Sequence, residues 1–355
     1  MVLIASIIAF LTTCLFIWTL QPLAHRVDLV DKPGGRKKHD GDIPLIGGIA
    51  IFFGLIVGLV LSDQPISDYT GLLIAGGMLL IVGTIDDFID LRASARFLAQ
   101  ITAAFIIIFS DGILLTDLGN LLGTGTLELG WFSIIFTLIA VVGVINATNM
   151  SDGMDGLAGG LGFITVLALS VISLTQHQGV NPVFLTILAT LTAFLLFNMR
   201  YKFNPSAKIF IGNGGSMLLG LILAWVLIHA AQGSNSIITP VTALWIFALP
   251  LLDTICVMIR RISKGKSPFA PDREHFHHIL LVAGYSVKQA VWIMIGIALF
   301  LASIGYLALE IKIPEAVLFF SMLSLFGLYY WGMSHAWRVM KAIRVEHKDS
   351  KTESA

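Results

Sequence analysis

The chain has 355 residues, of which 56% are apolar and only 12% charged, with 22 basic and 22 acidic residues. A soluble globular domain has about 25% charged residues, so this chain carries too little charge to cover a surface that faces water. Its zero net charge gives no reason to expect a nucleic-acid partner. The two cysteines, Cys14 and Cys256, both lie in apolar stretches and form no disulfide framework or metal-ligand pattern. These properties predict an integral membrane protein.

The first apolar stretch, 2–20, is the first predicted transmembrane helix. No Lys or Arg precedes Arg26, so the charged start of a signal peptide is missing and we expect this helix to be retained. Apolar stretches of similar length recur to the end of the chain, as expected for an all-α integral membrane protein with about eleven transmembrane helices. The predicted helices cover 2–20, 43–62, 70–85, 95–110, 131–147, 157–175, 182–199, 209–230, 240–259, 290–309 and 313–335.

The Lys and Arg residues fall almost entirely on one side of this topology. If the N-terminus is outside, 21 of the 22 lie in or beside the segments that become cytoplasmic, and only Lys312 does not. Cytoplasmic loops are rich in Lys and Arg, so the distribution predicts an outside N-terminus and a cytoplasmic C-terminus. The predicted outer loop, 111–130, has acidic residues and no basic residue. We expect one transmembrane domain, 1–335, followed by a basic cytoplasmic tail, 336–355.

The segment between the first two helices contains a basic run that includes Lys37 and His39. Its simplest interpretation is a cytoplasmic flank of the positive-inside pattern. The same run could attract the phosphate of a nucleotide or a lipid. Both interpretations stay open.

Two adjacent carboxylates, Asp86 and Asp87, end the third predicted helix. Ionisable residues at membrane depth are costly and usually functional, and carboxylate oxygens together with substrate phosphates suit Mg²⁺. The alternative is a solvated helix end that pairs with Arg92 and Arg96. The string DDxxD also occurs in soluble prenyl-diphosphate synthases, but those enzymes need a second such motif, which this chain lacks.

Three further polar clusters fall on the same predicted face. Asn146, Asn149, Asp152 and Asp155 are spaced by three residues, which places them on one face of a helix. The glycine-rich start of the helix at 209–230, which includes Asn213, is typical of an anion-binding helix N-terminus. The loop at 271–278 combines Arg273 with three histidines, for which phosphate binding is a better interpretation than zinc because a tetrahedral ligand set is missing. A solvated histidine-rich loop is the alternative.

Together these motifs resemble the polyprenyl-phosphate N-acetylhexosamine-1-phosphate transferases. The resemblance covers nearly the whole chain and rests on four motifs in order: Asp86-Asp87, the NxxNxxDGxDGL stretch from Asn146, IFIGNGGS at 209–216, and PDREHFHH at 271–278. It implies transfer of GlcNAc-1-phosphate from UDP-GlcNAc to undecaprenyl phosphate, with release of UMP, at the cytoplasmic side of the bacterial inner membrane. In the family this step begins O-antigen or enterobacterial common antigen synthesis.

The resemblance also implies a cofactor and roles for single residues. The cofactor would be Mg²⁺, with Mn²⁺ as the alternative, and a homodimer is left open. Where the family ordinarily has a metal-binding aspartate, this chain has Asn213. The implied catalytic residues are Asp86, Asp87, Asp152, His277 and His278; the substrate-binding residues are Lys37, His39, Asn146, Asn149, Asp155, Phe210, Arg273 and His275; and the metal site is Asp86, Asp87 and Asn213.

The chemistry of the acceptor favours a one-step reaction. A phosphate monoester has a second pKa of about 6, so the lipid phosphate is largely dianionic at neutral pH and can attack without a general base. A covalent aspartyl intermediate is the alternative. Two rival functions also remain: a sister enzyme that uses another UDP-sugar, such as UDP-GalNAc or UDP-MurNAc-pentapeptide, and a secondary transporter, although no inverted repeat is visible.

Overall fold

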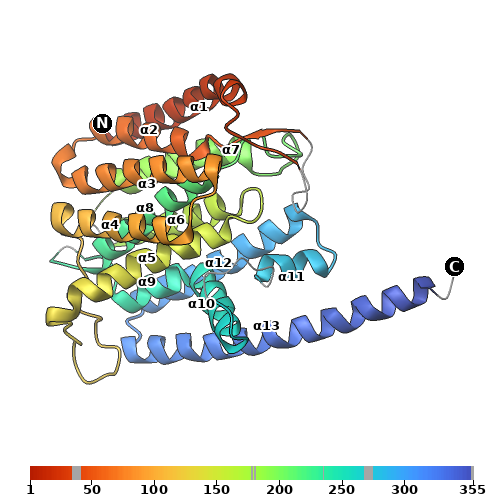
Figure 1. The fold of residues 1–355 in the computed structure, drawn as a ribbon. Coiled ribbons are helices and arrows are strands. Elements are labelled where there is room, and N and C mark those ends of the chain that lie inside the picture. The colour runs from red at the N-terminus through yellow and green to blue at the C-terminus, as the bar shows by residue number, and fades with distance from the viewer. Residues whose placement is uncertain (34–40, 177–178, 180, 235, 268–274, 353–355) are drawn as a thin grey trace.

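The fold is a bundle of apolar helices with a single short strand pair among the described residues (Figure 1). The structure, a computed structural model, describes residues 1–33, 41–176, 179, 181–234, 236–267 and 275–352. The helices are α1 (Val2–Arg26), α2 (Gly47–Val60), α3 (Thr70–Ile89), α4 (Ala93–Asp111), α5 (Ser133–Ser151), α6 (Leu157–Thr175), α7 (Pro182–Asn198), α8 (Gly212–Ala231), α9 (Pro240–Ile246), α10 (Ala248–Ser263), α11 (Phe276–Val282), α12 (Val287–Glu310) and α13 (Glu315–Thr352).

Each of the eleven predicted apolar segments coincides with a helix or a helix pair. Eight helices in the described part of the chain are long and apolar enough to cross a membrane: α1, α3, α4, α5, α6, α8, α12 and the first 22 residues of α13. The helices α2 and α7 are apolar but have only 14 and 17 residues. A helix rises about 1.5 Å per residue, so 14 residues cover only about 21 Å of a hydrocarbon core that is about 30 Å thick. The chain is therefore a multi-pass helical membrane protein.

The prediction of one straight helix over 240–259 was wrong. The segment is two helices, α9 and α10, that meet at Phe247 with an angle of 83° between them. Pro250 explains the break, because a proline has no N–H to donate to the carbonyl of Ile246 and its ring collides with that carbonyl. The first regular bond after the bend runs from the Leu251 N–H to the Phe247 carbonyl.

Helix α8 is the central element, buried along nearly its whole length between α2, α3, α5 and α6. Glycines allow its first turn to approach two neighbours closely. A Cβ added at Gly83 of α3 would overlap the Gly214 backbone, and one added at Gly48 of α2 would overlap the Gly215 backbone. The glycine-rich start of α8 is therefore explained first by helix packing.

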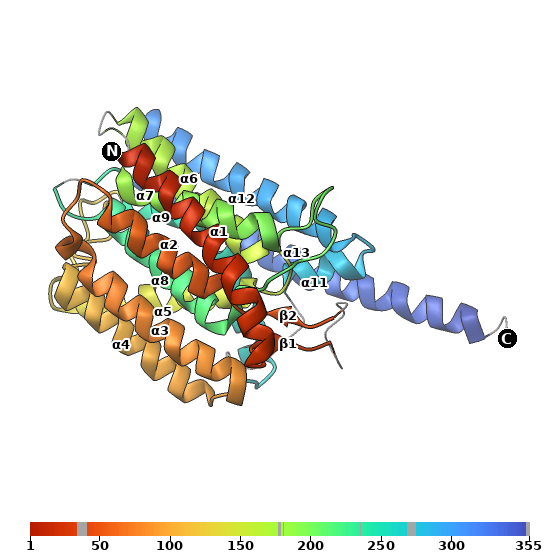
Figure 2. The same cartoon turned by 90° about the horizontal axis from the view of Figure 1, so that it is seen from above.

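One end of the bundle collects the polar elements. The strands β1 (Val30–Asp31) and β2 (Ile43–Pro44) pair in antiparallel fashion there, and α11 lies at the same end (Figure 2). The last helix also leaves the bundle on this side. The last helix was predicted to end at 335, but α13 continues as one helix to Thr352 and reaches far beyond the other helices (Figure 1).

Candidate active site

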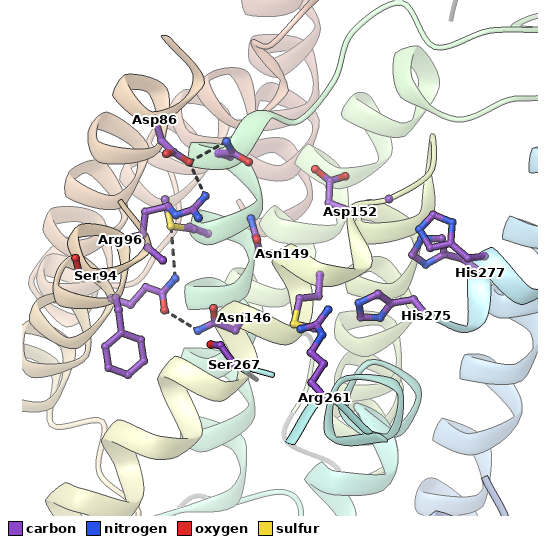
Figure 3. A pocket seen from close by; sticks show the side chains of 18 residues that line it. Asp86, Ser94, Arg96, Asn146, Asn149, Asp152, Arg261, Ser267, His275 and His277 are labelled. Carbon is purple, nitrogen blue, oxygen red and sulfur yellow. Dashed lines mark hydrogen bonds and ion pairs between the residues drawn. The ribbon is translucent and has the colours of Figure 1, made fainter. Parts of the chain in front are cut away.

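A cavity of about 540 Å³ opens at this end of the bundle, where α3, α5 and α10 end and α4, α8 and α11 begin. Figure 3 shows Asp86 and Arg96 on one side of it, His275 and His277 on the other, and Asp152 between them. The lining side chains come from all four of the motifs that the sequence analysis singled out. The predicted gathering of these motifs in one place is thus confirmed. The lining residues that had been predicted are Asp86, Asn146, Asn149, Asp152, Asn213, His275, His277 and His278.

Asp86 is buried and accepts three hydrogen bonds. Its Oδ1 accepts from the Leu91 N–H at 2.7 Å, and its Oδ2 accepts from Arg96 Nη1 at 3.0 Å and from Asn213 Nδ2 at 2.9 Å. Three donors, one of them a guanidinium, therefore compensate this buried side chain. The alternative interpretation, a solvated helix end that pairs with Arg92 and Arg96, agrees with the structure in the contact to Arg96 but not in its exposure, because Asp86 is buried. The metal role expected for Asp86 stays a prediction.

Asp87 faces the start of α8. Its two oxygens accept from the Asn213 backbone N–H at 3.1 and 3.2 Å. We had interpreted this glycine-rich helix start as an anion site, and in the structure a carboxylate of the protein lies at one N–H of its first turn, that of Asn213. A negative charge in that position is favoured by the partial positive charge of the helix N-terminus.

The two asparagines fix α5 against its neighbours. Asn146 Nδ2 donates to Gln100 Oε1 of α4 at 2.6 Å, and Asn149 Nδ2 donates to Ser216 Oγ of α8 at 2.7 Å. In the apolar interior such polar pairs stabilise helix association. The amide groups therefore connect three helices, and each still presents a surface to the cavity.

Asp152 follows the last residue of α5 and lines the cavity. Among the described residues no side chain donates a hydrogen bond to its carboxylate. The surrounding protein shields this carboxylate from bulk water. This desolvation by burial, followed by the negative charges of Asp87 and Asp155, raises the pKa of Asp152 to about 7. A bound cation would have the opposite effect and lower this pKa.

Three expected site residues, Asp87, Asp155 and Phe210, are not among the residues that line the cavity. Asp155 forms an ion pair with Arg200, whose Nε lies 2.6 Å from its Oδ2. Phe210 joins β2 to α8 through its backbone, since its N–H donates to the Pro44 carbonyl at 2.8 Å. The other expected substrate ligands, Lys37, His39 and Arg273, lie outside the described residues.

The three histidines lie on or beside α11, which the sequence analysis did not predict. The rings of His275 and His277 stack at 5.6 Å between centroids, and His277 lies 4.1 Å from His278. Burial, followed by the neighbouring histidines, lowers the pKa of His277 to about 3, so its ring is neutral at pH 7. A neutral imidazole still donates one N–H, which suits contact with a phosphate oxygen.

Gly153, in the Asp-Gly pair that follows α5, leaves the space that the His277 ring occupies. A Cβ added at Gly153 would lie 2.5 Å from His277 Nε2 and 2.8 Å from its Cε1. Any larger side chain at this position would displace the imidazole ring. The glycine therefore brings the acidic motif and the histidine motif into contact.

Sequence reasoning missed several residues of the site. Arg261 of α10 and Gln100 of α4 line the cavity and are almost fully buried. Asp253 of α10 lies 2.7 Å from His275, through its Oδ2 and the imidazole Nδ1. A lone aspartate inside an apolar segment is usually functional, and this rule would have identified Asp253 from the sequence.

The acidic residues fit a hard divalent cation only with help from the substrate. After burial, the charge of Asp87 contributes to the raised pKa of Asp152, and carboxylate oxygens are ligands that Mg²⁺ accepts. Among the described residues, however, no three His, Cys, Asp or Glu side chains are placed to hold a metal ion. Mg²⁺ commonly uses one or two carboxylates and completes its shell with phosphate oxygens and water, which this arrangement allows.

The fold and the cavity define a multi-pass membrane protein whose polar site, at one end of its helices, suits phosphorylated ligands. Residues 69–231 match glycosyl transferase family 4. The chain is 37% identical to an undecaprenyl-phosphate alpha-N-acetylglucosaminyl 1-phosphate transferase of Yersinia pestis over 94% of its length and 92% of the relative's. Proteins with the same description from Haemophilus influenzae and Escherichia coli K12 are 38% and 36% identical, over 95% of both chains and over 94% and 92% respectively.

At this identity over nearly the full length, the family is established. The chain belongs to the polyprenyl-phosphate N-acetylhexosamine-1-phosphate transferases, a branch of glycosyl transferase family 4.

Proposed function

We propose that this protein transfers GlcNAc-1-phosphate from UDP-GlcNAc to undecaprenyl phosphate and releases UMP. The observation that carries the proposal is the meeting of four separate motifs around one cavity of about 540 Å³, a size usual for small-ligand sites. The described relatives supply the identity of the transferred group and of the lipid acceptor.

Each wall of the cavity would have its own task. His277 and His278, with Arg261, offer donors for the diphosphate of the nucleotide sugar. On the opposite wall Arg96, which pairs with Asp86, lines the cavity and would bind the lipid phosphate. The acceptor oxygen would form a bond to the β-phosphorus, and the bond between that phosphorus and the bridging oxygen would break, leaving the electron pair on UMP.

A divalent cation, Mg²⁺ or Mn²⁺, would offset the negative charge of the diphosphate. Asp152 and Asn213 line the cavity, and the charge of Asp87 acts on Asp152. The two carboxylates would hold the cation, and the side-chain oxygen of Asn213 could contribute a neutral ligand. Because the dianionic lipid phosphate needs no general base, we favour direct attack over a covalent aspartyl intermediate.

The decisive experiment incubates purified protein with undecaprenyl phosphate and a panel of UDP-sugars, and measures UMP release. We expect release with UDP-GlcNAc that depends on both the lipid and Mg²⁺. Release only with UDP-GalNAc or UDP-MurNAc-pentapeptide would identify a sister enzyme. Uptake of a solute by proteoliposomes without UMP release would point to a transporter and refute the proposal.

We place the cavity at the cytoplasmic side of a bacterial inner membrane, with eleven spans that include α2 and α7. A single cysteine at Ser267 or at Thr124, in a chain whose Cys14 and Cys256 are replaced by serine, tests this orientation with a thiol reagent that cannot cross the membrane. The two positions lie beside the cavity and in the loop after α4, respectively. In intact cells we expect the cysteine at 124 to react and the one at 267 to react only after lysis. The reverse pattern would refute the orientation.

A further inference from the structure

Asp253 is a buried carboxylate that none of the steps above uses. It lies in α10, and its side chain is almost completely removed from solvent. A buried charge destabilises a protein unless donors or a cation compensate it. The partners of Asp253 therefore indicate what this charge is for.

Three groups from two other elements face the carboxylate. Oδ1 accepts from the Tyr329 hydroxyl of α13 at 2.8 Å and from the Phe276 N–H at 2.9 Å, and Oδ2 lies 2.7 Å from His275 Nδ1. The ring of Phe276 also packs edge-on against Tyr329. With Oδ1 occupied twice, Oδ2 has one fixed direction, and the imidazole lies in it.

This geometry determines which nitrogen of His275 carries the proton. An ionised carboxylate only accepts hydrogen bonds, so the ring must donate through Nδ1. His275 is one of the residues that line the cavity, and with Nδ1 held by Asp253 its Nε2 is the ring nitrogen left to meet a ligand. A histidine held through one nitrogen presents the other in a fixed orientation and with a defined protonation.

We propose that Asp253 and Tyr329 are positioning residues that hold His275 so that its Nε2 addresses the diphosphate of the nucleotide sugar. When that anion binds, the ring lies between two negative groups, which favours a second proton at Nε2 and makes it a donor to a phosphate oxygen. The donor gains strength as charge moves to the departing phosphate, so the contact acts mainly in the transition state. No bond of the transfer reaction passes through Asp253 or Tyr329. The inference rests on the proposed function.

The first test is kinetic and compares Asp253→Asn with the unaltered protein. An amide has nearly the same shape and its oxygen can still accept from Tyr329 and Phe276, but its NH₂ group would face His275. Nδ1 would then accept, and the ring would keep a single proton at Nε2. The contact with the phosphate would therefore lose the positive charge that the second proton supplies. We expect kcat for UMP release to fall about 10- to 100-fold while KM for UDP-GlcNAc changes little. A rise in KM at unchanged kcat would assign His275 to ground-state binding and overturn the proposal.

The second test separates position from folding and uses Tyr329→Phe. This variant removes only the hydroxyl that orients Asp253, and we expect a smaller loss of kcat in the same direction. Tyr330→Phe is the matched control, because it removes the same hydroxyl from the next residue of α13, whose ring packs on Phe326 instead. Equal losses in both variants, or none in Tyr329→Phe, would contradict the proposal.

A third measurement does not depend on activity. In protein labelled with ¹⁵N-histidine, the signals assigned to His275 by comparison with His275→Gln should show a protonated Nδ1, and Asp253→Asn should exchange the two nitrogens. An unprotonated Nδ1 in the unaltered protein would refute the positioning role. If the protein releases no UMP while Nδ1 is protonated as expected, the proposed function fails and the arrangement of His275 stands.

Discussion

Replacing Asn213 by aspartate would test the metal site directly. In the structure Asn213 Nδ2 donates to Asp86 Oδ2 at 2.9 Å. A carboxylate at this position would exchange that donor for a second anion. Two unit charges 2.9 Å apart repel by roughly 6 kcal/mol gross at an effective dielectric constant near 20. Arg96, 3.0 Å from the same oxygen of Asp86, can offset only one of the two charges.

The sign of the effect depends on the cation. In EDTA we expect Asn213→Asp to lower the free energy of unfolding by more than the roughly 2 kcal/mol that losing a hydrogen bond to a charged group usually costs, because the repulsion between the two carboxylates adds to that loss. Mg²⁺ carries two positive charges and would turn the repulsion into attraction. With Mg²⁺ we therefore expect the stability to return, the metal affinity to rise by about tenfold or more, and UMP release to become faster.

The assay has two readouts and a control. Thermal unfolding is followed in EDTA and in Mg²⁺, and UMP release is measured against Mg²⁺ concentration. Asn213→Ala removes the same hydrogen bond without adding a charge, so its loss of stability should be the same in EDTA and in Mg²⁺. If Asn213→Asp shows the metal dependence of the unaltered protein and no faster turnover, position 213 is not a metal ligand.

Three further predictions concern the carboxylates and the histidine loop. Asp87→Asn should lower turnover by about 10²–10³-fold in a folded protein, as judged by UMP release beside an unchanged melting temperature; near-normal turnover would make Asp87 structural. Gly153→Ala should displace His277 and lower kcat for UMP release about 10²-fold; an unchanged kcat would show that the position of His277 does not matter for turnover. The raised pKa of Asp152, about 7, predicts that activity rises as pH increases through 7 in low Mg²⁺ and that excess Mg²⁺ moves this limb to lower pH. The same shift makes the folded state bind the extra proton, so stability falls as pH rises from about 4 to 7, and Asp152→Asn should remove both effects.

The helices could be predicted because each apolar stretch reflects the cost of placing peptide groups in lipid. Hydropathy does not report the direction of a helix axis, however. The apolar run continues through the bend between α9 and α10, and Pro250 was the sequence signal of that bend. The continuation of α13 past 336 was missed for a related reason. Charged residues end a hydropathy window, but Lys, Arg and Glu are good helix formers and the helix continues to Thr352.

The candidate site was predictable as a set of motifs and only in part as a set of contacts. Asp86, Asp152 and the histidines were found because polar residues at membrane depth are rare, and the structure does bring them to one cavity. The sequence could not show that Asp155 would turn to Arg200. Such pairings depend on the distance between α7 and the turn after α5, which tertiary packing sets.

The acidic residues of the site differ in how many hydrogen-bond donors and cations of the protein contact their carboxylates. Asp86 has three donors, Asp253 has three facing groups, and Asp155 has an arginine. A carboxylate whose charge is already compensated gains little from a ligand. We therefore assign these three carboxylates a structural role in the walls of the cavity. Asp152 differs: it faces the cavity, and nearby Asp87 adds to the negative potential around it. Among the described residues, Asp152 is therefore the carboxylate of the cavity with the least compensation, and a metal-bound diphosphate would contribute most at this position.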